Sequence, residues 1–207
     1  MPANFNHIAP YYDGLAKIIF GNKLQAAKKV FLHKIPAGGS VLLMGEGTGT
    51  LLTHLLRIDP ALNMDYIDPS IKMLELARKK IRAEYVDQVQ FIAGTHQSIP
   101  PQKKYDAVLA FFVIDCMQQQ EAMEFVHSLT VVLKQDGCLL MADFFLPRNL
   151  YQQLLLWLMY RFFSVVAAIN TTSLPEYDSL FNSIVLAEEG RHNFMKGFIQ
   201  SRYYRKR

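Results

Sequence analysis

The residues whose types and spacing best suit chemistry form a short glycine-rich turn. Residues 45–49 read Gly-Glu-Gly-Thr-Gly and lie between an apolar run and a helical pattern. Because glycine has no Cβ, a ligand can lie against the backbone and the chain can take positive φ. The helix that follows directs free N–H groups and partial positive charge at whatever occupies the turn. An adenosine-type cofactor with a carboxylate or phosphate tail suits that environment.

The spacing of the glycines separates two kinds of cofactor. Dinucleotide folds prefer Gly-x-Gly-x-x-Gly, whose third glycine lets helix and strand pack closely. Here the third glycine, Gly49, comes one position early, and Thr50 stands where the dinucleotide pattern has glycine. The form Gly-x-Gly-x-Gly is the one seen in S-adenosylmethionine sites. Glycines after a strand can also serve only as a tight turn, so the interpretation needs a second feature.

An acidic side chain supplies that feature. Asp68 ends an expected strand roughly twenty residues beyond the turn, where a carboxylate can accept hydrogen bonds from both ribose hydroxyls. Ser70 is a good N-cap for the next helix, and Asp65, within the strand, is the weaker candidate. The alternative is that Asp68 is a turn residue before Pro69. With the glycine turn beside it, we expect Asp68 to bind ribose.

The order and spacing of these motifs resemble those of the class I S-adenosylmethionine-dependent methyltransferases. The similarity covers about residues 38–145, and its later segments are 91–100, 105–112 and 133–141. Thr95 departs from the family, which commonly has Asp there against the adenine amino group. A hydroxyl can still form a hydrogen bond, but without charge. The resemblance implies S-adenosyl-L-methionine as cofactor and S-adenosyl-L-homocysteine (SAH) as its product.

The resemblance also implies a role for each residue of the cofactor site. The glycine turn would approach the methionine part, and Glu46 would face its ammonium group through water or point to solvent. Met73 and Thr95 would flank adenine, with His96 beside them, and Phe111 would lie near the methionyl end. The expected cofactor-binding residues are Gly45, Glu46, Gly47, Gly49, Asp68, Pro69, Met73, Thr95, His96, Phe111 and Tyr12.

The N-terminus narrows the resemblance to one group of the family. Residues 5–13 resemble the opening of the ubiquinone and menaquinone C-methyltransferases, in which Tyr12 would help to cover the cofactor. The alternative is an amphipathic lid helix whose aromatic side chains only pack. The tail over 190–201 resembles the closing strands of that group more loosely.

Alternating strand and helix patterns predict an α/β fold with right-handed crossovers. We expect a Rossmann-like class I methyltransferase fold, with a mostly parallel seven-stranded sheet flanked by helices; the resemblance adds an antiparallel last strand. Expected strands are 40–45, 63–68, 89–93, 105–111, 138–144, 192–196 and 198–204, and expected helices are 5–20, 22–34, 49–57, 70–84, 118–133, 148–169 and 176–188.

Length and composition fit one domain over 1–207. Half of the residues are hydrophobic, which is ample for a parallel sheet buried on both faces. We expect lid helices in 1–37, the cofactor core in 38–145, substrate-cap helices in 146–190 and terminal strands in 191–207.

Charge, cysteines and histidines limit the kinds of partner. The net charge of +4 gathers near the C-terminus, and without an RNA-binding motif we expect no nucleic acid. Two cysteines and six scattered histidines show no ligand spacing, so we expect no metal. The N-terminus lacks a signal-peptide pattern, which predicts a cytoplasmic protein.

A long apolar segment over 150–169 allows several interpretations. Its length suits a membrane span, but Arg161 would cost on the order of 2.5–3.5 kcal/mol within the bilayer. A surface helix is therefore expected, lying on its own domain, on a dimer partner, on a greasy substrate or on a membrane. Its place in the family, over the acceptor pocket, suits a quinone-precursor-like or lipid-like acceptor. Five polar residues form one expected stripe on this helix, opposite a broad apolar face: Gln152, Gln153, Tyr160, Arg161 and Ser164.

Catalytic residues stay open, because methyl transfer from a sulfonium needs mainly alignment and exclusion of water. Asp115, His7 and Tyr11 are candidates for a general base, should the acceptor have to lose a proton. Two other functions stay open: a nicotinamide-dependent oxidoreductase, disfavoured by Thr50 and by the lack of a Tyr-x-x-x-Lys relay, and a non-catalytic module that binds S-adenosylmethionine.

Overall fold

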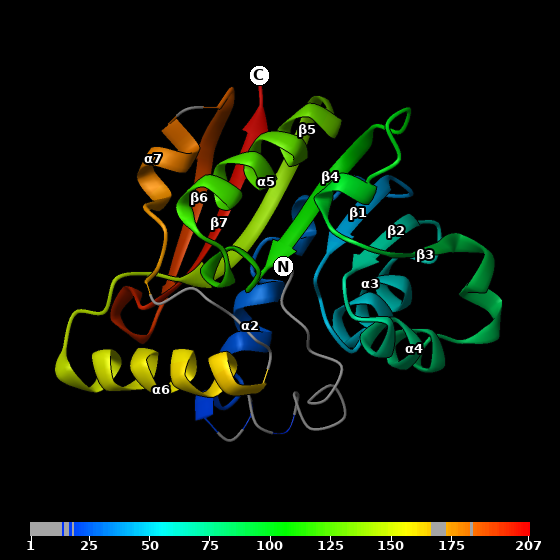
Figure 1. The fold of residues 1–207 in the computed structure, drawn as a ribbon. Helices are drawn as coiled ribbons and strands as arrows, with labels where there is room; N and C mark the ends of the chain where they lie inside the picture. The colour runs from blue at the N-terminus through cyan, green and yellow to red at the C-terminus, as the bar shows by residue number, and fades with distance from the viewer. Residues whose placement is uncertain (1–13, 15–16, 18, 167–172, 183) are drawn as a thin grey trace.

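The computed structural model describes residues 14, 17, 19–166, 173–182 and 184–207, and within them seven strands form one sheet in the order β3-β2-β1-β4-β5-β7-β6 (Figure 1). Strands β3 to β5 of that order run parallel, whereas β7 runs antiparallel to both β5 and β6. The predicted Rossmann-like sheet with an antiparallel last strand is confirmed. The strands are β1 Ser40–Met44, β2 Asn63–Asp68, β3 Val89–Ala93, β4 Tyr105–Phe111, β5 Leu133–Phe144, β6 Leu186–Phe194 and β7 Ile199–Lys206.

Helices cover both faces of this sheet, and each face has its own apolar cluster. Successive side chains of a strand point to opposite faces. Val41 and Leu43 of β1 therefore pack in one cluster, and Leu42 and Met44 pack in the other. Helices α2, α3, α4 and α6 contribute to the first cluster and α5 and α7 to the second. The helices are α2 Lys23–Lys29, α3 Thr50–Ile58, α4 Ile71–Lys80, α5 Gln119–Val132, α6 Leu150–Val166 and α7 Tyr177–Asn182.

The order of the strands creates a switch point between β1 and β4. From β1 the chain moves outward through β2 to β3 and then returns to β4, on the other side of β1. Loops that follow β1 and β4 consequently leave the sheet in opposite directions, which opens a crevice at the carboxyl ends of these strands. The predicted glycine turn follows β1 and so lies at this crevice.

Several predicted boundaries were wrong, most of all near the C-terminus. The helix expected over 176–188 ends at Asn182, and the strand expected over 192–196 is β6, which already begins at Leu186. Pairing with β7 overrides the local pattern here, and Glu188 and Glu189 form ion pairs with Arg202 and Arg205 of β7.

Other differences are smaller. Helix α4 ends at Lys80 and a 3₁₀ turn, Ala83–Gln88, takes up the rest of the expected helix. Strand β5 extends back to Leu133, and the expected helix over 22–34 divides into α2 and a short turn. The lid helix expected over 5–20 lies mostly outside the described residues.

Helix α6 follows the predicted polar stripe only in part. Gln153, Arg161 and Ser164 are exposed as expected. Gln152 is buried and Tyr160 half-buried, whereas Leu150, Leu154 and Trp157 are exposed. Gln152 turns inward because its amide group bonds the backbone at both ends: Nε2 donates to the Met195 carbonyl at 2.7 Å, and Oε1 accepts from Arg148 N at 2.7 Å. The exposed side of this helix therefore carries large apolar side chains next to polar ones.

The start of α3 packs directly on α4 through Gly49. This residue has φ of 79°, and a Cβ placed there would lie 2.6 Å from the Cβ of Ala77. Glycine is therefore required at this position by helix packing as well as by backbone conformation.

We expect Gly49→Ala to lower the free energy of unfolding more than Gly47→Ala does. Both residues have positive φ, which costs an alanine about 1–2 kcal/mol. Only at position 49 does the new methyl group also clash with α4, and overpacking adds about 1–3 kcal/mol. Urea denaturation of both variants measures the difference. Equal losses would contradict the packing role of Gly49.

Candidate functional site

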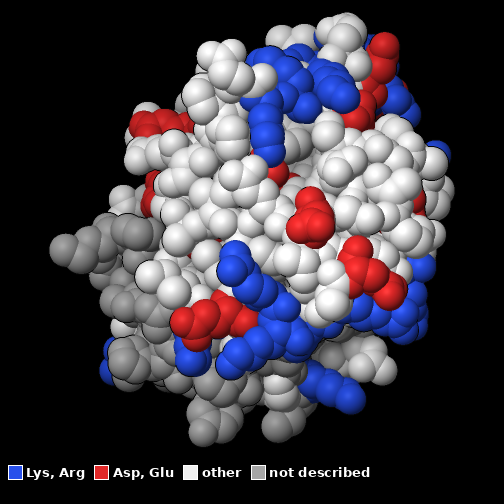
Figure 2. Space-filling view, turned by 90° about the vertical axis from the view of Figure 1, so that its right-hand side faces the viewer, with Lys and Arg blue, Asp and Glu red and all other residues white. Residues whose placement is uncertain are grey.

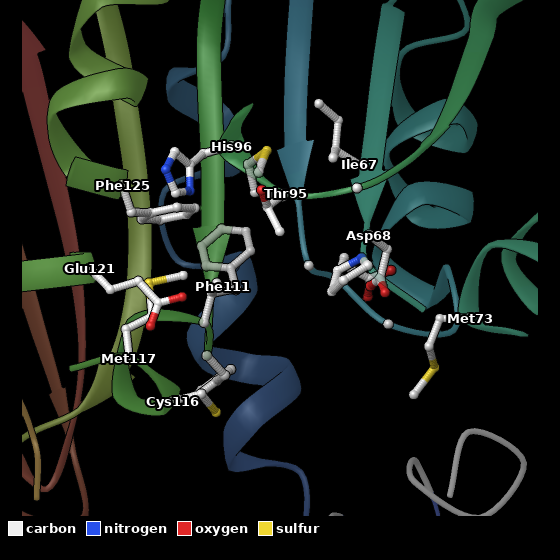
Figure 3. Close-up of a pocket in the computed structure, with 18 of the residues that line it drawn as sticks. Ile67, Asp68, Met73, Thr95, His96, Phe111, Cys116, Met117, Glu121 and Phe125 are labelled. Atoms are coloured by element: carbon white, nitrogen blue, oxygen red, sulfur yellow. The ribbon is translucent and has the colours of Figure 1, made fainter. Parts of the chain in front are cut away.

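A cavity lies at the carboxyl ends of β1, β2 and β4, at the switch point of the sheet (Figure 3). In Figure 3, Asp68 and Met73 lie on one side of this cavity and Phe111, Cys116 and Glu121 on the other. The residues that line it are Lys28, Met44, Gly45, Glu46, Gly47, Ile67, Asp68, Pro69, Met73, Gly94, Thr95, His96, Phe111, Phe112, Val113, Cys116, Met117, Glu121 and Phe125.

Most of the residues predicted from sequence meet in this cavity. Gly49 does not line it, because its position against Ala77 places it in the packing between α3 and α4. Tyr12 lies outside the described residues. The predicted residues that do line the cavity are Gly45, Glu46, Gly47, Asp68, Pro69, Met73, Thr95, His96 and Phe111.

Asp68 ends β2 and brings a buried carboxylate to the cavity. Its Oδ1 accepts a hydrogen bond from Ser70 N at 2.8 Å, and the residue is only 4% exposed. Burial raises its pKa to about 7, and the backbone N–H groups of Ser70 and Gly47 only partly oppose this rise. Asp65, the weaker candidate, instead accepts from Lys103 Nζ at 2.8 Å and from Tyr105 OH at 2.6 Å, and it does not line the cavity.

The side chain of Glu46 points into the protein, where its carboxylate is buried beside the glycine turn. Its Oε1 accepts from Leu51 N at 2.9 Å, which satisfies one of the free N–H groups at the start of α3. The same oxygen lies 3.4 Å from Nζ of Lys28, a residue of α2 that the sequence did not single out. Oε2 is buried without a hydrogen-bond partner among the described residues. The alternative in which Glu46 points to solvent is therefore wrong.

Met73, Thr95 and His96 also line the cavity. Met73 lies in the first turn of α4, which Ser70 caps by accepting from Met73 N at 3.2 Å. Thr95 begins a 3₁₀ turn, and the ring of His96 packs edge-on against Phe125 of α5 with centroids 5.7 Å apart.

The loop after β4 supplies four of the ten lining residues that sequence analysis missed: Phe112, Val113, Cys116 and Met117. Phe112 has φ of 57°, which is uncommon for a residue with a Cβ and is often found at functional sites. Val113 lies where a Cβ on Gly45 would come within 2.7 Å, so the two loops of the switch point are in contact. Phe125 and Glu121 reach the cavity from α5, and no local spacing rule connects them to the glycine turn.

Asp115 is buried in a pair with Asp143. It lies in the 3₁₀ turn Ile114–Cys116, and Asp143 on β5 accepts from Ile114 N at 3.1 Å and from Phe144 N at 2.9 Å. Burial raises the pKa of Asp115 to about 6, and burial with the neighbouring charge of Asp115 raises the pKa of Asp143 well above its ordinary value. The two carboxyls therefore share a proton near neutral pH.

This pair lies behind the cavity wall. Cys116 lines the cavity and its thiol donates to Asp115 Oδ1 at 3.6 Å, but neither carboxyl lines the cavity itself. Tyr160 of α6 donates to the Asp115 carbonyl at 3.2 Å. The other two candidates for a general base, His7 and Tyr11, lie outside the described residues.

Comparisons with known proteins agree with this geometry. A family model described as a methyltransferase domain matches residues 41–137. The chain is 31% identical over 138 residues to a demethylmenaquinone methyltransferase of Lactobacillus johnsonii, covering 64% of this chain and 56% of the relative. It is 29% identical over 142 residues to malonyl-[acyl-carrier protein] O-methyltransferase 2 of Ilyobacter polytropus, covering 68% of this chain and 52% of the relative.

A solved structure shows the same fold. Magnesium protoporphyrin IX methyltransferase of Synechocystis, with SAH bound, superposes with a TM-score of 0.66 at 17% identity, over 95% of this chain and 88% of that one. The sheet order and the cavity thus define a Rossmann-like methyltransferase fold. Residues 41–137 match a methyltransferase domain, and the relatives that the chain resembles are methyltransferases, which supports a class I S-adenosylmethionine-dependent methyltransferase with S-adenosyl-L-methionine as cofactor. The chain spans about half the length of the curated relatives that it matches.

We expect the buried carboxyl pair to make folding stability fall as pH rises. A carboxyl whose pKa is raised holds its proton more tightly in the folded chain, so its contribution is complete below the unfolded pKa and is lost as pH rises through about 6. Asp143→Asn removes one of the two titrating groups and should lessen this decline. Urea denaturation over a series of pH values measures it.

Asp106→Asn is the matched control. Although burial acts against it, hydrogen bonds from Lys134 and Ser40 hold the pKa of Asp106 below its usual value, so this carboxyl stabilises the fold above the unfolded pKa and stops doing so in acid. Its replacement should therefore alter the acid side of the profile. An Asp143→Asn profile identical to that of the wild type would contradict the shared proton.

Proposed function

We propose that this protein transfers a methyl group from S-adenosyl-L-methionine to a small, apolar acceptor. The observation that carries the proposal is the buried carboxyl of Asp68 beside the glycine turn. An ionised carboxylate at the end of the second strand accepts hydrogen bonds from both ribose hydroxyls. Met73 on one side and Thr95 with His96 on the other would then hold adenine. The cavity is proposed as one site within a single domain over 1–207.

The amino-acid tail of the cofactor finds a matching pair of charges. Glu46 Oε2 is buried and lacks a partner among the described residues, and a buried unsatisfied carboxylate oxygen costs free energy. An ammonium group would satisfy it. Lys28 Nζ lies beside this carboxylate, at 3.4 Å from the other oxygen, and can donate to the carboxylate of the tail. The two side chains would thus bind a zwitterion at the turn.

The bound sulfonium supplies an already activated methyl group. The chain's own residues then have to align the acceptor and keep water out. Phe111 and Phe112 make an apolar wall on the acceptor side of the cavity, and Phe125 packs against His96. Helix α6 and the rest of 146–190 would cap the acceptor. Asp115 stays a candidate base if the acceptor must lose a proton, although its carboxyl lies behind the cavity wall and does not line the cavity.

An apolar acceptor is preferred to an anionic one on the charges of the cavity. One of the two relatives is named for demethylmenaquinone and the other for malonyl-[acyl-carrier protein]. Among the described lining residues, Lys28 is the only Lys or Arg, and it lies next to Glu46. Glu121 on the acceptor side would repel a carboxylate. These charges favour a quinone-precursor-like or lipid-like acceptor, and the methylated atom can be carbon, oxygen or nitrogen.

The two other functions left open by the sequence predict different results when ligand binding and methyl transfer are measured. A nicotinamide-dependent oxidoreductase would bind NADH in preference to SAH. A non-catalytic module would bind SAH and transfer nothing. The apolar face of α6 adds a peripheral membrane contact to the proposal, with a homodimer as the alternative use of the same face.

We expect SAH to bind more tightly as pH rises through about 7, where Asp68 becomes ionised. Below that pKa, the affinity should fall by up to about tenfold per pH unit, because binding must remove a proton from the carboxyl. Asp68→Asn keeps only one acceptor oxygen and should weaken binding by about tenfold to a hundredfold, with no step near pH 7. Isothermal titration calorimetry measures both effects.

Asp65→Asn is the control for Asp68→Asn. It removes the same charge from the same strand, but Asp65 binds Lys103 and Tyr105 away from the cavity. SAH affinity should therefore stay close to that of the wild type, even if the fold is less stable. Unchanged SAH affinity in Asp68→Asn, or tighter binding of NADH than of SAH, would refute the proposed site.

The acceptor is tested by incubating the protein with methyl-labelled S-adenosylmethionine and a cell lipid extract. We expect labelled products that are heavier by one methyl group and that partition into organic solvent. Asp68→Asn should lower the yield with the Asp65→Asn control unaffected. Label found only in water-soluble products would contradict an apolar acceptor, and no label in any product would favour the non-catalytic module.

A further inference from the structure

Helix α6 exposes several large apolar side chains to solvent, in addition to those that it buries against the protein. In Figure 1 it lies across one end of the molecule, beyond the edge of the sheet. Its underside is anchored by Gln152, Leu155 and Met159, which are all buried. Its outer side carries the exposed apolar side chains Leu150, Tyr151, Leu154, Trp157 and Leu158, with Leu150 82% and Trp157 59% exposed. The exposed polar residues Gln153, Arg161 and Ser164 lie beside them.

The exposed residues share one face because of their spacing. Positions 150, 154, 157 and 158 follow the three- and four-residue steps of a helical stripe. An ordinary surface helix has the opposite arrangement, with charged residues outward. None of the helices in the described residues is long and apolar enough to cross a membrane. The face of α6 therefore suits binding to a surface and not insertion across one.

Cations surround this face. Lys196 lines one groove together with Leu150 and Tyr151, and Arg161 lines another together with Trp157. Arg148 precedes the helix and its guanidinium packs near Gly197, next to Lys196. All three cations are exposed, and no ion pair joins them to a carboxylate of the described residues.

Acidic residues are absent from the same stretch of sequence. No Asp or Glu occurs between Asp143 and Glu176, nor after Met195. The other side of the molecule differs. On the face shown in Figure 2, blue and red side chains lie close to one another. Elsewhere in the molecule, exposed cations do pair with carboxylates, as Lys72 does with Glu75 on α4. Unbalanced positive charge at an apolar face is thus a local property of α6.

We infer that the outer face of α6, defined by Leu150, Tyr151, Leu154, Trp157 and Leu158, docks on an anionic lipid surface through its apolar side chains and the surrounding cations Arg148, Arg161 and Lys196. Apolar residues with Trp and Tyr at the headgroup level, flanked by Lys and Arg, are the chemistry that binds a helix in the plane of an interface. A second copy of the chain fits less well, because a two-fold contact would bring the same cations toward one another.

Trp157 makes the inference directly measurable, since it is the only tryptophan of the chain. We expect its fluorescence to shift to the blue, and to be quenched by brominated lipid, when vesicles with about a third phosphatidylglycerol in phosphatidylcholine are added. Vesicles of phosphatidylcholine alone should bind much more weakly. Added salt should weaken binding to the anionic vesicles, because exposed charges are screened.

Two sets of variants separate the apolar and the charged contributions. Leu154→Glu with Leu158→Glu should abolish vesicle binding, whereas Met123→Glu, an exposed apolar position on α5, should leave it unchanged. Replacing Arg148, Arg161 and Lys196 by Gln keeps the apolar face and should lower affinity by about a hundredfold, at about 1 kcal/mol for each charge. The charge variant keeps the test decisive should the Leu variants fail to fold.

Three results would overturn the inference. One is no response of Trp157 to anionic vesicles, and a second is equal binding to neutral and anionic vesicles. The third is a blue shift that appears without vesicles and grows with protein concentration, together with a dimer in sedimentation velocity. That result would show that the outer face of α6 is a dimer interface. The inference does not rest on the cofactor chemistry. SAH titration of the same samples shows whether the cavity is intact. If the wild-type protein binds SAH but does not bind vesicles, the docking of α6 on lipid is refuted and the proposed cofactor site is not.

Discussion

The burial of the Asp68 carboxylate is the constraint on which the site depends. A carboxylate taken out of water costs free energy unless hydrogen bonds or opposite charge satisfy it. Here backbone N–H groups offset part of that cost, no ion pair joins it to a Lys or Arg of the described residues, and the pKa rises to about 7. A neutral diol suits such a carboxylate, because two O–H groups can donate to it without bringing in another charge. The same group can therefore select a ribose and make its binding depend on pH.

The fold joins this carboxylate to the glycine turn through contacts of β2. Tyr66 is fully buried two residues before Asp68, and its hydroxyl donates to the Gly47 carbonyl. Gly45 N in turn donates to the Ile67 carbonyl at 2.9 Å. The turn and the end of β2 are thus held as one unit. From the other side of the switch point, Val113 packs against Gly45 and closes the loop after β4 onto the same turn.

The sequence was sufficient to predict the parts of the site that depend on local pattern. The glycine turn, the acidic end of β2 and the N-cap at Ser70 follow from a strand, a turn and a helix in order, and all three are present. Lys28, Phe125 and the burial of Glu46 could not be predicted in this way. They depend on how α2 and α5 pack across the sheet, and no spacing along the chain encodes that packing. Phe112 has a positive φ, which marks it in the structure but cannot be predicted from its residue type.

Helix α6 shows the opposite kind of error. The expected polar stripe is solvent-exposed only in part, because Gln152 finds backbone partners within the protein and is buried, whereas Leu150, Leu154 and Trp157 are exposed. Hydrophobic pattern alone gives the two sides of a helix and not which side is buried. At the C-terminus, similarly, charged residues of β6 follow a pattern that a helix could carry, and pairing with β7 decides the structure.

The central claim is that Asp68 and the glycine turn together bind the nucleoside of a methyl donor, and a crystal structure of the complex with SAH tests it most directly. We predict that both ribose hydroxyls lie within about 2.6–3.0 Å of the Asp68 carboxylate, and that the amino-acid tail lies along the turn between Lys28 and Glu46. SAH bound elsewhere, or ribose hydroxyls directed away from Asp68, would contradict the account.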